Sequence, residues 1–337
     1  MSRGLTGGSQ GSGGGNRSDF FKGQYMNEIE KPERLPAYIL AQRQSLPMSC
    51  KAIFSTKRIN AFYDHYEGQV VVGFSGGKDS RVVLDLVRKL HPDVRGVFSD
   101  TGLEYPEIRA FVKTFEDIDW IKPVKTFKQV ISEFGVPILS KQIARALEDL
   151  QNPTEKNKNI RNLYLTGKTR DGRNAPRFKL AKKYYLLIDA PFRISAKCCA
   201  YLKEKPLEQY AATNKVQFIT GLMAADSERR RGVYLQNGGC VTFGKKGNLW
   251  ALGIWTEADV WEYIKKTACS YCCIYDKGEA RTGCIFCGFG LMFETESENR
   301  FTRLKKLHPK LYDYCMEELG MKVVLEWVWR CMKKSEK

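Results

Sequence analysis

The pattern of apolar and polar positions changes near the end of the first fifth of the chain. Residues 19–68 carry apolar side chains at helical spacing. Residues 69–74 are a short β-branched run, which predicts a buried strand. Helical spacing returns at 80–90, a second short strand is expected at 95–99, and a further helix at 106–115. This order predicts a parallel sheet with right-handed crossovers.

The later part of the chain continues this alternation. Residues 216–221 form another candidate strand, and a helix is expected to begin at Thr256, a good N-cap followed by acidic residues. We therefore predict an α/β fold with a twisted, mainly parallel sheet and helices on both faces. Four parts are expected: a flexible tail at 1–18, a helical segment at 19–68, an α/β domain at 69–253 with a basic insert at 154–183, and a cysteine-rich, helical lobe at 254–337.

Composition narrows the class of protein. Hydrophobic residues make up 43% and charged residues 28% of the 337 residues, as in globular proteins, which excludes fibrous or wholly disordered chains. No run of about 18 apolar residues exists, so no membrane partner is expected. The first 18 residues lack the apolar core of a secretory signal, which predicts a cytoplasmic protein. In that setting, eleven cysteines favour metal or redox chemistry over disulfides.

The charge is strongly positive and unevenly distributed. The net charge is +17, and the insert at 154–183 contributes +8, from ten Lys and Arg residues and two acidic residues. Such a balance indicates a polyanionic partner, DNA or RNA, or an anionic substrate. A solvated basic loop is the alternative for the insert.

A glycine pair follows the first predicted strand and precedes the next predicted helix. Glycines let the backbone approach a ligand closely, and free N–H groups at a helix start attract anions. The motif differs from a Walker A loop, in which Lys is followed by Ser or Thr. It predicts a phosphate site made by Ser75, Gly76, Gly77, Lys78, Asp79 and Ser80.

These six residues resemble the PP-loop of the ATP pyrophosphatase superfamily. Residues 98–107, FSDTGLEYPE, resemble the second motif of the phosphoadenosine-phosphosulfate (PAPS) reductase family, and further similar segments extend to about residue 290. The resemblance implies an adenine nucleotide alpha hydrolase-like fold that binds an adenine nucleotide or a sulfonucleotide. It also implies that Asp100, beside Thr101 and Gly102, orients the nucleotide or holds a metal such as Mg²⁺. The candidates for binding the substrate anion are Lys141, Lys205, Arg229 and Arg230.

Two pairs of cysteines provide a candidate metal centre, Cys198 with Cys199 and Cys284 with Cys287. Soft thiolates suit an iron–sulfur cluster or zinc, and the spacing alone does not separate the two. An adjacent pair with a distant CxxC resembles the 4Fe–4S site of adenylyl-sulfate reductases, so a 4Fe–4S cluster is expected ahead of zinc. Three other cysteines are interpreted as small buried residues or alternative ligands: Cys269, Cys272 and Cys273.

Three functions remain open from the sequence. The first is reduction of adenylyl sulfate or PAPS with an external thiol reductant. The second is ATP-dependent sulfur transfer to a nucleic acid from a sulfur donor protein, as in DNA phosphorothioation systems. The third is a nucleic-acid-binding zinc protein. Assimilatory reductases carry a catalytic cysteine in a Glu-Cys-Gly-type tail, whereas Cys331 lies in WVWRCMKKSEK, so the sequence identifies no catalytic residue.

Overall fold

The computed structural model describes residues 33–244 and 246–333. The tail predicted at 1–18, and residues 19–32 of the predicted helical segment, lie outside the described residues. The described chain starts with two helices, α2 (Ala37–Gln44) and α3 (Met48–His65). Helix α3 packs against the first helix of the α/β domain and thereby joins its core.

A six-stranded sheet forms the centre of the described part of the molecule. Its order is β3-β2-β1-β5-β7-β6, and within the described residues its one antiparallel pair is β6–β7. The mainly parallel α/β fold predicted from the sequence is therefore confirmed. The strands are β1 (Val70–Gly73), β2 (Gly96–Ser99), β3 (Ile118–Ile121), β5 (Gln217–Thr220), β6 (Val241–Thr242) and β7 (Asn248–Trp250).

Helices cover both faces of the sheet, as predicted. The chain runs from β1 to β2 and β3, then returns to place β5 on the other side of β1. With right-handed crossovers, this reversal puts the connecting helices of the two halves on opposite faces. The first face carries α4 (Lys78–Leu90) and α5 (Pro106–Val112), and the second carries α9 (Lys205–Asn214). Helix α11 (Glu257–Thr267) packs on α4, and Thr256 caps it as expected.

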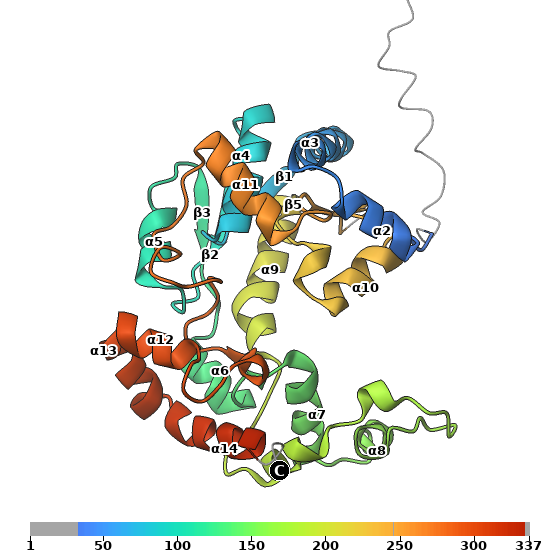
Figure 1. Cartoon of the computed structure of the whole chain (residues 1–337), viewed down its shortest axis with the longest axis vertical. Helices are drawn as coiled ribbons and strands as arrows, with labels where there is room; N and C mark the ends of the chain where they lie inside the picture. Colours follow the sequence, from blue (N-terminus) through green and yellow to red (C-terminus); the bar gives the residue numbers. More distant parts are fainter. Residues whose placement is uncertain (1–32, 245, 334–337) are drawn as a thin grey trace, which may run out of the picture.

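A second, mostly helical part lies below the sheet in the view of Figure 1. It includes a two-stranded parallel sheet that the sequence did not predict, in which Ile138 pairs with Gly288. Its elements are α6 (Phe127–Phe134), β4 (Ile138–Leu139), α7 (Lys141–Gln151), β8 (Gly288–Phe289), η5 (Leu291–Phe293), α12 (Arg300–Leu307), α13 (Pro309–Asp313), η6 (Tyr314–Glu318) and α14 (Met321–Lys333). The remaining elements outside the insert are η3 (Ala200–Glu204), η4 (Ala224–Asp226) and α10 (Glu228–Gln236).

The basic insert extends from the side of α7 as an arm (Figure 1). The sequence predicted a charge-rich insert without a helix, but its first half contains α8 (Lys158–Thr166), on which Tyr164 is buried. Gly167 ends this helix in the left-handed conformation, and η1 (Pro176–Phe178) and η2 (Lys182–Asp189) follow. Among residues 33–244 and 246–333, no helix is long and apolar enough to cross a membrane.

Candidate functional site

The predicted phosphate loop connects the end of β1 to the start of α4. Ser80 stabilises the turn: its hydroxyl accepts a hydrogen bond from the backbone N–H of Ser75 (3.1 Å) and donates one to the carbonyl of Gly77 (2.9 Å). Gly77 is the N-cap of α4, so the N–H groups of the first turn have no acceptor within the helix. These groups are suited to an anion, as the sequence predicts.

Glycine is required at the tip of this loop. Gly76 has a φ of 74°, which other residues rarely adopt. A Cβ atom there would also lie 2.7 Å from the side chain of Val112 on α5. At the end of β5, a Cβ on Gly221 would lie 3.0 Å from the carbonyl of Asp79. Close packing of three elements thus fixes the shape of the loop.

The side chains of Lys78 and Asp79 interact with each other and with Glu257, so Lys78 is not a free cation that faces a phosphate. The Lys78 side chain is buried, and its ammonium lies 3.1 Å from Glu257 and 3.8 Å from Asp79. Burial raises the pKa of Asp79, and Lys78 only partly offsets this effect. The positive charge of Lys78 is therefore already balanced within the protein, which leaves backbone N–H groups as the main anion donors of the loop.

The second motif begins at the carboxyl end of β2, next to the phosphate loop. Asp100 is buried and accepts a hydrogen bond from Arg109 of α5 at 2.8 Å. The backbone N–H of Gly102 also donates to Asp100 (3.4 Å). The structure thus brings Asp100, Thr101 and Gly102 to the sheet edge where ligands of open α/β sheets bind.

Glu104 extends this motif toward the cysteines. Its carboxylate accepts hydrogen bonds from the N–H (3.1 Å) and the hydroxyl (2.8 Å) of Thr101. It also lies 3.6 Å from the ammonium of Lys203. Because Glu104 is buried, these partners stabilise its charge.

The four predicted anion-binding residues lie in two groups. Lys141 forms an ion pair with Glu204 (3.0 Å). Lys205 follows Glu204 in the chain, and its ammonium lies 3.7 Å from the centre of the Tyr201 ring. Arg229 and Arg230 lie on α10, where Arg230 pairs with Asp226. Asp226 interacts electrostatically with Asp79, so this second group adjoins the phosphate loop.

The two predicted cysteine pairs converge from distant parts of the chain. Cys198 and Cys199 precede η3, whereas Cys284 and Cys287 precede β8. Burial raises the pKa of the Cys198 thiol, and the other three thiols raise it further. The four thiols are therefore close enough to interact electrostatically.

Lys203 is the cation beside these thiols. Its side chain hydrogen-bonds Cys284, and it faces Glu104 on the other side. Burial alone would lower the pKa of Lys203, but Cys284 and Glu104 raise it well above its usual range. Burial also raises the pKa of Cys287, to about 12, with a further contribution from Cys284. Without a bound cation, the Cys287 thiol is therefore neutral at physiological pH.

The donor set fits a soft metal, but not a single ion in this conformation. Within the described part of the chain, no group of three or more His, Cys, Asp and Glu side chains is arranged to hold a metal ion. A single zinc ion requires its sulfur ligands at about 2.3 Å. An iron–sulfur cluster inserts several atoms between its cysteines, so it needs thiols that are neighbours without being in contact. Four neighbouring thiols are the number of ligands that such a cluster takes.

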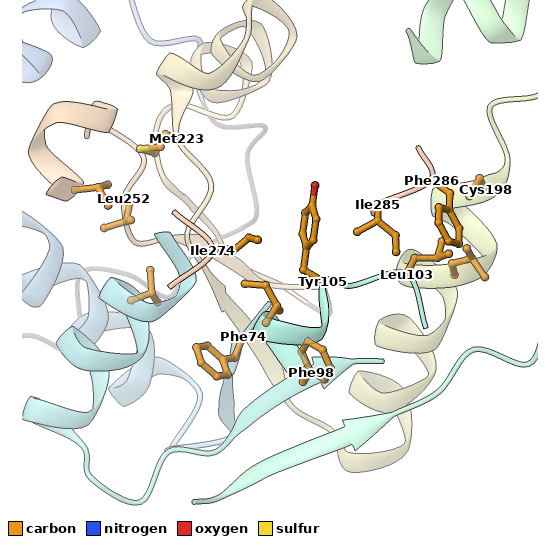
Figure 2. Close-up of a cluster of buried hydrophobic side chains, with 14 of the residues drawn as sticks. Phe74, Phe98, Leu103, Tyr105, Cys198, Met223, Leu252, Ile274, Ile285 and Phe286 are labelled. Atoms are coloured by element: carbon orange, nitrogen blue, oxygen red, sulfur yellow. The ribbon is translucent and has the colours of Figure 1, made fainter. Parts of the chain in front are cut away.

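The four converging thiols, which we call the cysteine centre, lie next to the second motif at residues 100–104. The backbone N–H of Ile285, between the two cysteines of the CxxC, donates a hydrogen bond to the carbonyl of Leu103 (2.8 Å). Figure 2 shows the side chains of Leu103, Ile285, Phe286 and Cys198 gathered in one apolar cluster. A cavity of about 320 Å³ opens alongside, lined by Gly102, Glu104, Arg109, Lys113 and Ile285 among others.

The second group of cysteines lies elsewhere. Cys269 is buried near Arg81 and Asp85 of α4, and Cys272 is buried near Glu107 of α5. Cys273 is exposed. The structure therefore places these three residues apart from the four converging thiols.

Sequence reasoning did not single out Glu104, Lys203 or Tyr275 as site residues. Lys203 follows Cys199 by four positions, and this spacing puts two side chains on the same side of a helical segment. The spacing could therefore have predicted that Lys203 lies near the thiols. The hydroxyl of Tyr275 accepts a hydrogen bond from the N–H of Lys78 in the phosphate loop (2.9 Å). No local pattern predicts that contact, because 197 positions separate the two residues.

A mainly parallel sheet with a glycine loop at its carboxyl edge is the arrangement in which open α/β folds bind their ligands. The model of the phosphoadenosine phosphosulfate reductase domain matches residues 69–137 and 145–288, which is more than half of the chain. The chain therefore belongs to the PAPS reductase family.

Individual relatives are distant. An uncharacterized protein of Methanocaldococcus jannaschii is 26% identical over 252 residues, which are 73% of this chain and 46% of that protein. The chain thus spans about half the length of this relative. Adenosine 5'-phosphosulfate reductase of Anoxybacillus flavithermus is 26% identical, over 67% of this chain and 75% of that enzyme. The corresponding enzyme of Staphylococcus haemolyticus is 28% identical, over 67% and 72%.

One solved structure aligns with part of this chain. It is the phosphate complex of phosphoadenylyl-sulfate (PAPS) reductase from Candida auris, which aligns with a TM-score of 0.36 and 15% identity. The alignment covers 64% of this chain and 81% of that chain.

Proposed function

We propose that this chain is an enzyme that binds adenylyl sulfate or PAPS at the phosphate loop and reduces its sulfate group. The observation that carries the proposal is the contact between the two candidate sites. Residues 100–104 start beside the phosphate loop and end against Lys203 and the CxxC segment. A nucleotide held at the loop would therefore extend toward the thiols.

Each part of the site has a distinct role in this proposal. The N–H groups at the start of α4 bind the nucleotide phosphates, because the helix dipole and the free donors favour an anion there. Asp100, held by Arg109, orients the nucleotide. Arg229 adds positive charge near the loop, whereas the charge of Arg230 is already paired with Asp226. Lys113 lines the cavity beside Gly102 and suits a sulfate or a second phosphate, and Arg109, paired with Asp100, lines it too.

A 4Fe–4S cluster is the proposed resident cofactor. Cys198, Cys199, Cys284 and Cys287 would hold it, and Lys203 would offset part of the negative charge of their thiolates. When bound, the cluster supplies a localised charge and a rigid anchor that joins the η3 segment to the CxxC segment. The proposal assigns no electron-transfer step to it.

The reaction requires a reductant from outside the described residues. Reduction of the sulfate sulfur to sulfite takes two electrons, which two thiols supply as they form one disulfide. The sulfur–oxygen bond to the nucleotide phosphate breaks, and the nucleotide leaves with that oxygen on its phosphate. Cys331 lies buried in α14, so it is not suited to attack a substrate in this conformation. We therefore assign the thiols to an external thiol reductant.

Product identification tests the proposal. Anaerobically purified protein is incubated with a dithiol and, in separate reactions, adenylyl sulfate, PAPS or ATP. Sulfite with AMP, or with the 3'-phosphorylated AMP from PAPS, is the expected result. Formation of AMP and pyrophosphate from ATP, without sulfite from either sulfonucleotide, would contradict it and favour an activating sulfurtransferase.

A specific observation supports a second candidate, ATP-dependent sulfur transfer to a nucleic acid. Eight of the ten basic residues of the arm are exposed, and its two acidic residues already pair with Lys158 and Arg173. Phe178 is exposed in the same arm. Exposed cations interspersed with an aromatic ring are typical of surfaces that bind single-stranded or double-stranded nucleic acid.

Salt dependence tests this second candidate. Phosphate contacts release counterions, so binding should weaken steeply as salt rises. Neutralising Lys156, Lys158, Arg161, Lys168, Arg170 and Arg173 together should flatten the salt slope by about five units if all six reach phosphates. Gel-shift titrations with DNA and RNA at several salt concentrations measure this slope. Absence of salt-dependent binding by the unaltered protein would make the arm a solvated surface.

A further inference from the structure

The segment at 275–282, which we call the strap, crosses the phosphate loop. The hydroxyl of Tyr275 accepts a hydrogen bond from the N–H of Lys78, the first residue of α4 (2.9 Å). The same hydroxyl lies 3.1 Å from the hydroxyl of Thr282. One of the donors that a phosphate would use is therefore already occupied by a protein side chain.

Further contacts hold the strap over the loop. The ammonium of Lys78 donates to the carbonyl of Ala280 (3.5 Å) and lies 5.3 Å from the centre of the Tyr275 ring. A Cβ atom on Gly77 would lie 2.6 Å from the hydroxyl oxygen of Thr282 and 3.3 Å from that of Tyr275. The space directly above Gly77, where a phosphate would approach the backbone, is thus filled by the two hydroxyl groups.

The middle of the strap is anchored by ion pairs to other elements. Lys277 lies 2.6 Å from Glu107 of α5, and Glu279 lies 3.2 Å from Arg303 of α12. Between them, Gly278 has a φ of 92°, in a region that favours glycine. The strap then leads directly to the CxxC segment of the cysteine centre. Contacts outside the phosphate loop therefore hold the middle of the strap, whereas Tyr275 and Ala280 hold it to the loop itself.

We propose that Tyr275 is an autoinhibitory stopper of the phosphate loop, which nucleotide phosphates must displace in order to bind. This inference rests on the proposed nucleotide site and adds a regulatory step to it. A neutral phenol is a weaker partner for the N–H groups of a helix start than a charged phosphate, so displacement is favourable. The stopper lowers the affinity for phosphate by the strength of the contacts that must be broken.

The variant Tyr275→Phe tests the stopper directly. It keeps the ring against Trp261 and Lys78 but removes the hydroxyl that occupies the donor. Inorganic pyrophosphate is the probe, titrated calorimetrically into the full chain. One hydrogen bond has a net strength that corresponds to a change in Kd of roughly two- to tenfold. We expect Tyr275→Phe to bind pyrophosphate more tightly than the unaltered protein by about this factor.

Two controls make the result specific. Tyr271→Phe removes a hydroxyl from an exposed tyrosine that bonds Asp276 instead of the loop, so its affinity should not change. Trypsin cleavage after the exposed Lys277 and Arg281 gives a second readout. Saturating pyrophosphate should speed cleavage of the unaltered protein, because the strap loses its contact with the loop.

The outcomes separate the stopper from the nucleotide site itself. Equal or weaker pyrophosphate binding by Tyr275→Phe, with normal binding by the unaltered protein, would overturn the stopper and leave the site intact. Slower or unchanged cleavage of the strap with saturating pyrophosphate would also overturn it. Absence of binding by both proteins would overturn the nucleotide site and the stopper together.

Discussion

The phosphate loop and the cysteine centre are built by the chain in opposite ways. The loop takes all six of its residues from one turn between β1 and α4, and its shape follows from two glycines and a hydrogen-bonded serine. The cysteine centre takes its thiols from two segments and its balancing charge from a further side chain, Lys203. The phosphate loop can therefore be predicted from a local sequence motif. The cysteine centre forms only when the fold brings distant segments together.

The two sites nevertheless share structure. Residues 100–104 contact both, and the strap leads from Tyr275 at the loop to the CxxC segment at the thiols. Variants that disable one site at a time show whether each site binds its own group without the other. The expected effects range from complete loss of a bound group to no change.

The largest effect is expected from Cys284→Ser. Serine is a poor substitute for a soft thiolate, so iron and sulfide in anaerobically purified protein should fall to background. Iron analysis and visible absorption measure this loss. Nucleotide binding should persist, since the phosphate loop keeps all its donors. Full iron retention would mean that the ligands lie elsewhere.

The converse variant is Gly77→Val. Its branched side chain would occupy the space above the loop, where even a Cβ atom lies 2.6 Å from Thr282. Calorimetric titration with AMP or adenylyl sulfate should detect no binding, while the iron content stays that of the unaltered protein. Unchanged nucleotide affinity would remove the loop from the proposed site.

A partial effect is expected from Lys203→Met. This change removes the cation between Cys284 and Glu104 but leaves every thiol in place. Loss of a residue that supports metal ligands typically weakens metal affinity by roughly 10–100-fold. Chelator competition, followed by iron release, measures it. Lys203→Arg keeps the charge and should release iron at close to the original rate. Equal loss in both variants would assign Lys203 a packing role.

A change in stability alone is expected from Lys51→Met. Lys51 is buried and forms an ion pair with Asp259 at 2.7 Å, which joins α3 to α11. Removing one partner of a buried pair costs about 3–5 kcal/mol, measured as the free energy of unfolding in urea. Burial raises the pKa of Asp259, but hydrogen bonds from Lys51 and Thr256 outweigh it and lower the pKa overall.

The pH dependence of this cost has a definite sign. A carboxylate with a lowered pKa stabilises the fold above its unfolded pKa of about 3.9, and this contribution is lost as the pH falls through the folded pKa. The difference in unfolding free energy between Lys51→Met and the unaltered protein should therefore shrink in acid. A difference that stays constant from neutral pH down to a pH of about 3 would indicate lost packing instead of lost charge pairing.

No effect on bound iron is expected from Cys269→Ser. Its thiol lies beside α4, away from the four converging thiols, although Cys269 and Cys272 repeat the CxxC spacing of Cys284 and Cys287. Iron analysis beside Cys284→Ser makes this a matched comparison. Iron loss equal to that of Cys284→Ser would show that sequence spacing, and not convergence in the fold, identifies the ligands.

The sequence predicted the parts of the fold that depend on neighbouring residues. The valines of β1, the glycines of the loop and the Thr256 cap each act over a few positions, so their patterns were sufficient. It missed the pairing of β4 with β8, because two-residue strands carry almost no pattern and their partner lies far along the chain. It also missed helix α8 in the arm, because the many charged and polar residues there concealed the helical spacing around Tyr164.

The site shows the same division. Residues 75–80 and 100–102 lie where their motifs suggested, since the carboxyl ends of adjacent parallel strands meet at one edge. The pairing of Lys78 with Glu257 was not predictable from the loop, and it changes the role of this lysine. The contact between Tyr275 and the loop likewise depends on how the last third of the chain folds back over the first.

We propose that the phosphate loop and the cysteine centre form one site, and the visible absorption of the proposed cluster is the measurement that tests this most directly. Anaerobically purified protein is titrated with adenylyl sulfate, and its spectrum is recorded beside that of Gly77→Val. We expect a saturable change in the cluster absorption of the unaltered protein and none in the variant. An unchanged spectrum at a nucleotide concentration that saturates binding in calorimetry, or an equal change in Gly77→Val, would contradict it.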